Sequence, residues 1–237
     1  MHSVAYDISI QLGNGSIGAL HKQFLIARKL FSGANLNQLL DEVDREIQTT
    51  EQYHSFPMLG QKMHLYKNAV QTLIGDEAGS SSKATIGSKD GPEHHKEIAF
   101  VLLEIVCMTF LGNYERVQYM YKRWEKEGEH DLKKMVSFRG AYVSFYYGLS
   151  VIGLRRKKNP NARRVNISIK AREDAVKNAA ECSTWNFGNK KALLQAEKMS
   201  LALQNRDAEV QYDAAIKASR ESMFVHEEGL GKNTLRE

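Results

Sequence analysis

The sequence predicts an all-α protein in which antiparallel helical hairpins stack into a degenerate α-solenoid. Three observations predict this fold class. Apolar residues recur with helical periodicity along nearly the whole chain, whereas the alternation typical of strands is almost absent. Only 3 prolines occur in 237 residues, and each stands where a helix could begin or a loop could run. Short breaks that contain glycine or polar residues separate the periodic segments.

Helix boundaries follow from the periodic segments and from residues that cap helices. Gly33, Gly75 and Gly112 are expected to end helices, because glycine tolerates the left-handed backbone of a C-terminal cap. Asn35 and Asn186 are the expected N-caps of the helices that follow them. We expect helices at residues 3–12, 17–31, 36–54, 57–74, 93–111, 114–128, 131–155, 166–181, 187–203, 206–221 and 224–235.

We expect residues 1–237 to form a single α-helical repeat region that belongs to a longer array, interrupted by two segments. Residues 76–92 are rich in Ser, Gly and small polar residues, which predicts a flexible loop between two hairpins. Residues 155–164, RRKKNPNARR, contain six basic residues and no acidic residue, which predicts a basic connector between helices.

The basic connector accounts for the net charge of +5. Without its six basic residues, the total of 33 Lys and Arg falls close to the 28 acidic residues, so no chain-wide nucleic-acid-binding face is predicted. We interpret the connector first as a solvated loop. The alternatives are an address resembling a nuclear-import signal and a contact with an anionic membrane, nucleic acid or an acidic partner. The residues of this possible contact are Arg155, Arg156, Lys157, Lys158, Arg163 and Arg164.

Small residues in the segment 192–218 predict a close helix contact. Ala196, Ala208, Tyr212 and Ala215 have the spacing of a tetratricopeptide-type hairpin, in which small residues let two backbones approach and the tyrosine fills the adjacent groove. Such spacing also occurs in an irregular helical bundle, and that alternative stays open.

The same four-residue step recurs in two other places. Val117 and Tyr121 follow the break at residues 112–113, and Leu20, Phe24 and Ala27 lie at steps of four and three. The separations between these segments do not keep a strict period, so the predicted repeat is degenerate.

Residues 185–231 resemble the tetratricopeptide-like helical region of large multidomain signalling ATPases. The earlier segments QTLIGD (71–76) and LGNYERV (111–117) fall in the order expected of that region, so the resemblance covers most of the chain. In that family, which includes hybrid histidine kinases, serine/threonine kinases and nucleotide cyclases, the region follows a kinase-like domain and an ATPase of the AAA or STAND-like type. It precedes an output module. Gly229 and Gly231 depart from the family's alanines, so we expect a frayed final helix. The resemblance rests on Asn186, Phe187, Lys190, Leu194, Ala196, Glu197, Tyr212, Ala215, Ile216, Ala218, Glu227 and Glu228.

Motifs for catalysis or cofactor binding are not found in the sequence. No glycine-rich turn ends in the Gly-Lys-Ser/Thr of a phosphate loop, and no nucleophile elbow or His-Glu-x-x-His motif occurs. His94 and His95 are the best metal candidates, but adjacent helical residues point about 100° apart and chelate poorly together. Tyr142, Phe145 and Tyr146 are expected in the core. We therefore expect no catalytic residue, cofactor or metal site.

The function expected from these patterns is that of a non-catalytic interaction and relay module in a signalling protein. Stacked hairpins would offer a concave surface to protein partners or to neighbouring domains. The alternative is an enzyme whose site is assembled from scattered residues. No transmembrane segment is expected, the start of the chain lacks the pattern of a signal peptide, and a cytoplasmic location follows. Cys107 is expected to be a small buried residue.

Overall fold

The computed structural model describes residues 2–52, 57–75, 98–126, 138–156 and 166–235. Every regular element within these residues is a helix, which confirms the all-α fold class. The predicted loop at 76–92 lies outside the described residues. Among the described helices, none combines the length and apolar character that a membrane span requires.

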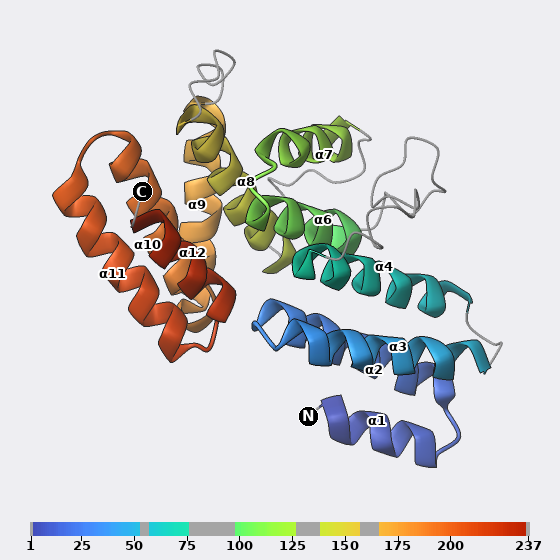
Figure 1. Cartoon of the computed structure of the whole chain (residues 1–237). Coiled ribbons are helices and arrows are strands. Elements are labelled where there is room, and N and C mark those ends of the chain that lie inside the picture. Colours follow the sequence, from blue (N-terminus) through green and yellow to red (C-terminus); the bar gives the residue numbers. More distant parts are fainter. Residues whose placement is uncertain (1, 53–56, 76–97, 127–137, 157–165, 236–237) are drawn as a thin grey trace. The chain divides into compact units, whose positions relative to one another are not determined.

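The described helices fall within two compact units, residues 1–90 and 91–237. Each described helix, shown in Figure 1, overlaps one of the helices expected from the sequence. Residues 1–90 contain α1 (His2–Gln11), α2 (Gly15–Phe31), α3 (Leu36–Gln52) and α4 (Pro57–Ile74). Residues 91–237 contain α6 (Ile98–Phe110), α7 (Tyr114–Lys126), α8 (Phe138–Arg156), α9 (Asn166–Cys182), α10 (Thr184–Leu201), α11 (Asn205–Glu221) and α12 (Val225–Leu235).

In the first unit, α2 packs against α1, α3 and α4, and α3 also packs against α4. The most buried residues of α2 are not those whose spacing the sequence singles out. Leu20 and Phe24 are each 42% exposed, while Ile26 and Leu30 are buried. Ile26 follows Phe24 by two positions, roughly 200° around a helix. The most buried residues of α2 therefore lie away from Leu20 and Phe24 on the helix surface.

In the second unit, α8 is the central helix, in contact with α6, α7, α9 and α10. Its residues from 140 to 152 are buried around the whole circumference, as expected of a helix enclosed by others. Tyr142, Phe145 and Tyr146 lie in this stretch with 3%, 0% and 1% exposure, which confirms their predicted place in the core.

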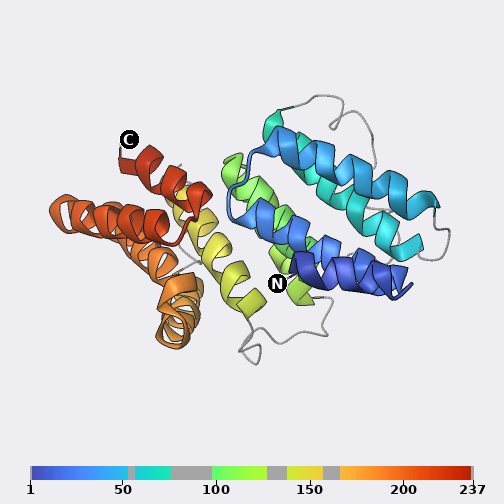
Figure 2. The same cartoon turned by 90° about the horizontal axis from the view of Figure 1, so that it is seen from below.

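The α10–α11 hairpin buries the small residues on which its prediction rested. Ala196, Ala208, Tyr212 and Ala215 are all buried, and the two helices lie side by side (Figures 1 and 2). The expected close helix contact is thus present.

Four connections between helices share one backbone turn. After the first helix, one residue adopts left-handed φ: Gly13 at 70°, Gly112 at 67°, Leu203 at 61° and Met223 at 59°. The N–H of the next residue donates to the carbonyl oxygen five positions earlier. The carbonyl oxygen of the same residue accepts from the N–H four positions later, so this residue ends one helix and starts the next. The back-donated bonds are Asn14–Ser9 (2.8 Å), Asn113–Met108 (2.9 Å), Gln204–Met199 (3.0 Å) and Phe224–Ser219 (2.8 Å).

Most predicted caps are present, with one exception. Gly33, Gly75 and Gly112 have positive φ after their helices, and Asn35 Oδ1 accepts bonds from the N–H groups two and three positions on. Asn186, in contrast, is no N-cap. The helix α10 begins two residues earlier, and the Asn186 side chain donates to Ser183 Oγ (2.9 Å) inside its first turn.

The last helix continues through both glycines that predicted fraying. α12 extends from Val225 to Leu235, and its Glu227 side chain is 1% exposed. The reason is tertiary packing, because the buried face of a helix commonly outweighs its weak intrinsic propensity.

Candidate functional site

The most unusual feature of the described residues is a fully buried ion pair. Lys190 of α10 and Glu227 of α12 have side chains that are 0% and 1% exposed, and Lys190 Nζ lies 3.0 Å from Glu227 Oε1. The Tyr146 hydroxyl, from α8, donates a 3.0 Å hydrogen bond to the same oxygen. We call Tyr146, Lys190 and Glu227 the buried triad. It joins three helices at one point.

Aromatic rings surround the lysine of the buried triad. Lys190 Nζ lies 3.9 Å from the ring centroid of Phe224, 4.7 Å from that of Tyr142 and 6.0 Å from that of Phe145. Ring faces attract a cation, and they do so more strongly where water is absent. The rings therefore replace part of the hydration that the ammonium loses on burial.

Electrostatics of the buried triad follow from this burial. Desolvation lowers the pKa of Lys190, and the charge of Glu227 opposes the shift only in part. Burial and the charge of Glu227 raise the pKa of Tyr146 well above its usual range. Tyr146 consequently keeps its proton and acts as a donor to the carboxylate.

Two atoms of the buried triad lack hydrogen bonds of good geometry. Lys190 Nζ has its ion pair and its ring contacts but no hydrogen bond of good geometry, and Glu227 Oε2 has no hydrogen-bond partner among the described residues. Such unsatisfied groups are uncommon in folded proteins and offset part of the attraction between the charges. The ammonium and carboxylate are also closed to solvent, so a substrate could not reach them in this conformation.

Sequence reasoning included Lys190 and Glu227 only as residues of the family resemblance. A local signal for Lys190 did exist, because it stands between Phe187 and Leu194 at steps of three and four, on the buried side of α10. A lysine on such a stripe predicts a buried partner. The partner, 37 positions away in Glu227, has no local signal.

The structure describes two of the six residues of the expected basic contact. Arg155 and Arg156 lie in the last turn of α8, and the other four residues, Lys157, Lys158, Arg163 and Arg164, lie outside the described residues. Arg156 pairs with Glu197 Oε2 of α10 (2.9 Å) and donates to Ser200 Oγ (3.1 Å) and to the Tyr212 hydroxyl (3.2 Å). The expectation that the whole connector lies outside the packed hairpins is therefore wrong for Arg156.

A partly open cavity of about 200 Å³ borders this ion pair. Arg156 and Glu197 neutralise each other on its wall. Burial and the charge of Glu197 raise the pKa of nearby Tyr212 to about 12 against the opposing effect of Arg156, so its phenol stays protonated. The described lining is Thr109, Phe110, Gly112, Tyr114, Leu149, Gly153, Arg156, Leu193, Glu197 and Leu230. It offers no paired nucleophile and base.

Cys107 lies in α6 and is buried as predicted. Burial, together with the charge of Glu104, raises the pKa of its thiol to about 12. Because the thiolate is the nucleophile, a thiol held protonated in this way is inert.

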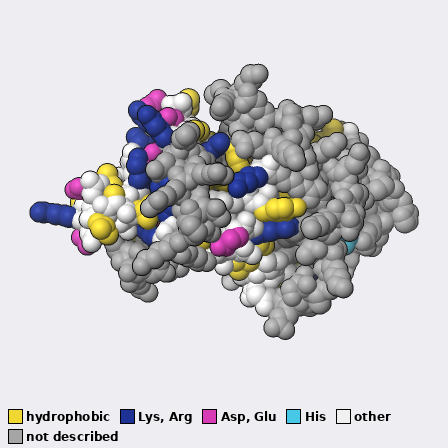
Figure 3. Space-filling model, turned by 90° about the horizontal axis from the view of Figure 1, so that it is seen from above, with side chains coloured by type: hydrophobic (Ala, Val, Ile, Leu, Met, Phe, Trp, Pro, Cys, Tyr) yellow, Lys and Arg dark blue, Asp and Glu magenta, His cyan; other side chains and the backbone are white. Residues whose placement is uncertain are grey.

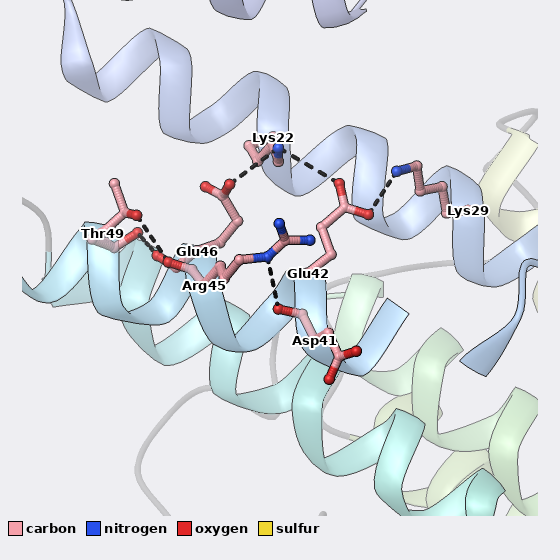
Figure 4. A network of polar contacts seen from close by, with 8 residues as sticks. Lys22, Lys29, Asp41, Glu42, Arg45, Glu46 and Thr49 are labelled. Atoms are coloured by element: carbon pink, nitrogen blue, oxygen red, sulfur yellow. Dashed lines mark hydrogen bonds and ion pairs between the residues drawn. The ribbon is translucent and has the colours of Figure 1, made fainter. Parts of the chain in front are cut away.

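A second group of charges joins α2 and α3 in the first unit (Figure 4). Lys22 Nζ lies 3.1 Å from Glu46 Oε1 and 3.5 Å from Glu42 Oε1, and Lys29 Nζ lies 2.6 Å from Glu42 Oε2. Both lysines lie on α2 and both glutamates lie on α3, so the ion pairs connect the two helices as a structural network.

Charges elsewhere are mixed in sign. On the face drawn in Figure 3, described Lys and Arg side chains lie among Asp, Glu and apolar side chains. Three or more His, Cys, Asp or Glu side chains placed to hold a metal do not occur within the described residues. His94 and His95 lie outside those residues.

Large apolar side chains are exposed at both ends of α11. Leu203, in the α10–α11 turn, is 85% exposed, and Met223, in the α11–α12 turn, is 70% exposed. Because successive helices are antiparallel, the starts of α10 and α12 lie at the Met223 end, where Trp185 is 59% and Val225 is 55% exposed. We call Trp185, Met223 and Val225 the apolar end.

Comparisons with known proteins return no relatives. A scan against protein-family models, a search of curated proteins and a search of solved structures each find no match.

Proposed function

We propose that this chain is a non-catalytic interaction and relay module whose helical hairpins bind a protein partner through exposed residues of their turns. The shared backbone turn of the four connections supports a degenerate tetratricopeptide-like repeat, because repeated hairpins of this kind use one connection many times. A place in an intracellular signalling protein, next to other domains, remains part of the same proposal.

The observation that carries the proposal is the pair Leu203 and Met223. Both side chains stand at left-handed φ, where the equivalent positions of two other turns have Gly13 and Gly112. A side chain with a Cβ is disfavoured at such φ by roughly 1–2 kcal/mol. Both side chains are also large, apolar and mostly exposed to water.

At both Leu203 and Met223, the left-handed φ and the exposure of a large apolar side chain each cost free energy. We expect a favourable interaction to offset this cost. Packing within the described residues does not supply one, because 85% of Leu203 and 70% of Met223 remain exposed. Burial of exposed apolar anchors is the usual gain in a protein interface. A protein partner that covers these turns supplies it.

The alternative function, an enzyme with a site of scattered residues, has one observation in its favour. The cavity beside Arg156 and Glu197 contains both charge types and several apolar residues. These two groups pair with each other, and the described lining contains no other charged side chain. This weighs against the alternative.

The test is photo-crosslinking in cells of the organism that encodes the chain. The photoreactive residue p-benzoylphenylalanine replaces Leu203 or Met223, one at a time, in the full chain. We expect each position to form an adduct with the same discrete protein. As matched controls, Glu209 and Lys217 are exposed positions of α11 with charged side chains, and we expect no protein adduct there.

Adducts of equal yield at all four positions would indicate nonspecific contact and would contradict the proposal. The absence of a protein adduct at both Leu203 and Met223 would also contradict it.

A further inference from the structure

We infer that α12 is a releasable segment, positioned on the second unit by the buried triad and able to separate while α8–α11 stay folded. This inference rests on the contacts of α12 alone and stands whether or not the proposed partner exists.

The contacts of α12 are unevenly distributed. It packs mainly against α11, with fewer contacts to α10, and it lies alongside α11 in both ribbon views (Figures 1 and 2). Glu227 adds polar links to Lys190 of α10 and to Tyr146 of α8, and Glu228 adds one to Arg220 of α11. The ring of His226 also lies 5.3 Å from that of Phe110 in α6. Glu227 is the residue of α12 that makes an ion pair with α10 and a hydrogen bond with the central helix.

The helix itself is intrinsically weak. Gly229 and Gly231 lie inside an element of 11 residues, and glycine in a helix interior is less favourable than alanine. A short helix of this composition depends on its tertiary contacts for its existence. If those contacts are lost, α12 unfolds as well as separates.

Separation of α12 has opposite effects on the hydration of a buried charged pair and of a buried apolar pair. When α12 leaves, Lys190 and Glu227 regain hydration that burial removed, and this gain favours the open state. An apolar pair of the same size would instead expose apolar surface to water. The buried triad therefore fixes the position of α12 with specificity while keeping the opening accessible.

Separation would expose a defined surface. Phe224 immediately precedes α12, and Tyr142 and Phe145 line the other sides of Lys190. The uncovered groove would present an ammonium flanked by aromatic rings. Such a surface matches an acidic amphipathic segment, which is the chemistry that Glu227 and α12 themselves provide.

The test is hydrogen–deuterium exchange of the full chain, resolved by peptides. We expect the amides of α12 to exchange at least about 10-fold faster than those of the protected middle of α10, in an opening that leaves α8 and α10 protected. Equal exchange rates in α12 and α10 would overturn the inference.

Variants separate the role of the charges from general stability. The triple variant Lys190→Met, Glu227→Leu and Tyr146→Phe removes every polar group of the buried triad. We expect exchange in α12 to slow by at least about 10-fold in this variant. Glu227→Leu alone leaves Lys190 without its carboxylate, and we expect exchange in α12 to accelerate by a similar factor while α10 stays protected.

The matched control is Glu228→Gln, one position along the same helix, where the carboxylate pairs with Arg220 and Lys232 near the surface. We expect exchange in α12 to change by less than about 3-fold in this variant. Loss of protection throughout α8–α11 in Glu227→Leu would overturn the inference, and so would an unchanged or faster exchange of α12 in the triple variant.

Discussion

At the scale of single residues, Gly229 and Gly231 of α12 differ in what a methyl group would meet. A Cβ added to Gly229 has no neighbour within 4 Å, whereas one added to Gly231 would lie 3.0 Å from Ile216 Cγ1. We expect Gly229→Ala to stabilise α12 by about 1 kcal/mol through helix propensity. Gly231→Ala should give no gain, because crowding against Ile216 offsets the same propensity.

The protection of the α12 amides from hydrogen exchange measures the stability of α12 in both glycine variants. The expected result is about 5-fold higher protection in Gly229→Ala, which corresponds to about 1 kcal/mol. Equal gains in the two variants would show that the contact with Ile216 relaxes freely.

Leu203 and Met223 allow a second prediction at this scale. Replacement by glycine removes the unfavourable left-handed φ of a residue with a Cβ. We expect Leu203→Gly and Met223→Gly each to raise the free energy of unfolding by up to about 1 kcal/mol, since the flexibility of glycine in the unfolded chain cancels part of the relief. Urea unfolding checks this. A loss of stability would mean that these side chains pack within the fold.

Residue identities explain why part of the site could not be predicted. Lys190 is visible in the sequence as a lysine on an apolar stripe, but its pairing with Glu227 depends on how α12 packs, which no local pattern encodes. Asn186 shows the converse error. Its preference for N-caps is real, yet the helix begins at Thr184, and its side chain bonds to Ser183 instead.

At the scale of helices, the close approach of α7 and α8 depends on Gly153. A Cβ at this position would lie 2.2 Å from Cε2 of Tyr114, which is too close for any ordinary contact. We expect Gly153→Ala to destabilise the fold by about 1–3 kcal/mol through overpacking, as measured by urea unfolding. Adding Tyr114→Leu should restore part of the loss, and the absence of any rescue would place the strain elsewhere.

The α2–α3 network gives a prediction about pH. Burial of Glu42 works against its ionisation, but the hydrogen bond and charge of Lys29 and the charge of Lys22 outweigh burial and lower its pKa below the ordinary value of 4.5. A carboxylate with a lowered pKa stabilises the fold above its unfolded pKa and loses that effect as pH falls through the folded pKa.

Unfolding of the chain between pH 7 and pH 3 tests this prediction. We expect stability to fall below about pH 4.5, with a smaller fall in Glu42→Gln, because the substituted side chain does not titrate. Identical pH profiles for the two proteins would show that the network contributes nothing measurable.

Helix positions were predictable because periodicity and caps are local properties. All the described helices overlap expected segments, and their ends differ by at most three residues where the neighbouring residues are also described. The faces of the helices were less predictable. Leu20 and Phe24 form as good a stripe as Ile26 and Leu30 in the sequence of α2, and the positions of α1, α3 and α4 decide which residues are most buried.

At the scale of the whole molecule, the charge distribution predicts how the chain meets polyanions. The excess of basic residues is concentrated in RRKKNPNARR, and Arg156 is already engaged with Glu197. We expect binding to nucleic acid or anionic vesicles to be weak, sensitive to salt and absent at physiological ionic strength. Titrations at low and physiological salt measure it.

The matched variants for polyanion binding are Lys157→Gln with Lys158→Gln, which remove charge and leave the Arg156–Glu197 ion pair intact. Any binding at low salt should weaken in this double variant, with the helical content unchanged. Salt-resistant binding that survives both substitutions would point to a different basic surface.

The central claim is that this chain acts through the exposed residues of its turns and not through a catalytic pocket. The most direct measurement is calorimetry between the chain and the protein identified by crosslinking at Leu203 and Met223. We expect Leu203→Asn with Met223→Asn to weaken binding at least about 10-fold, as loss of two interface anchors would, and Glu209→Gln with Lys217→Gln to leave it unchanged. Unchanged affinity in the first variant would contradict the claim.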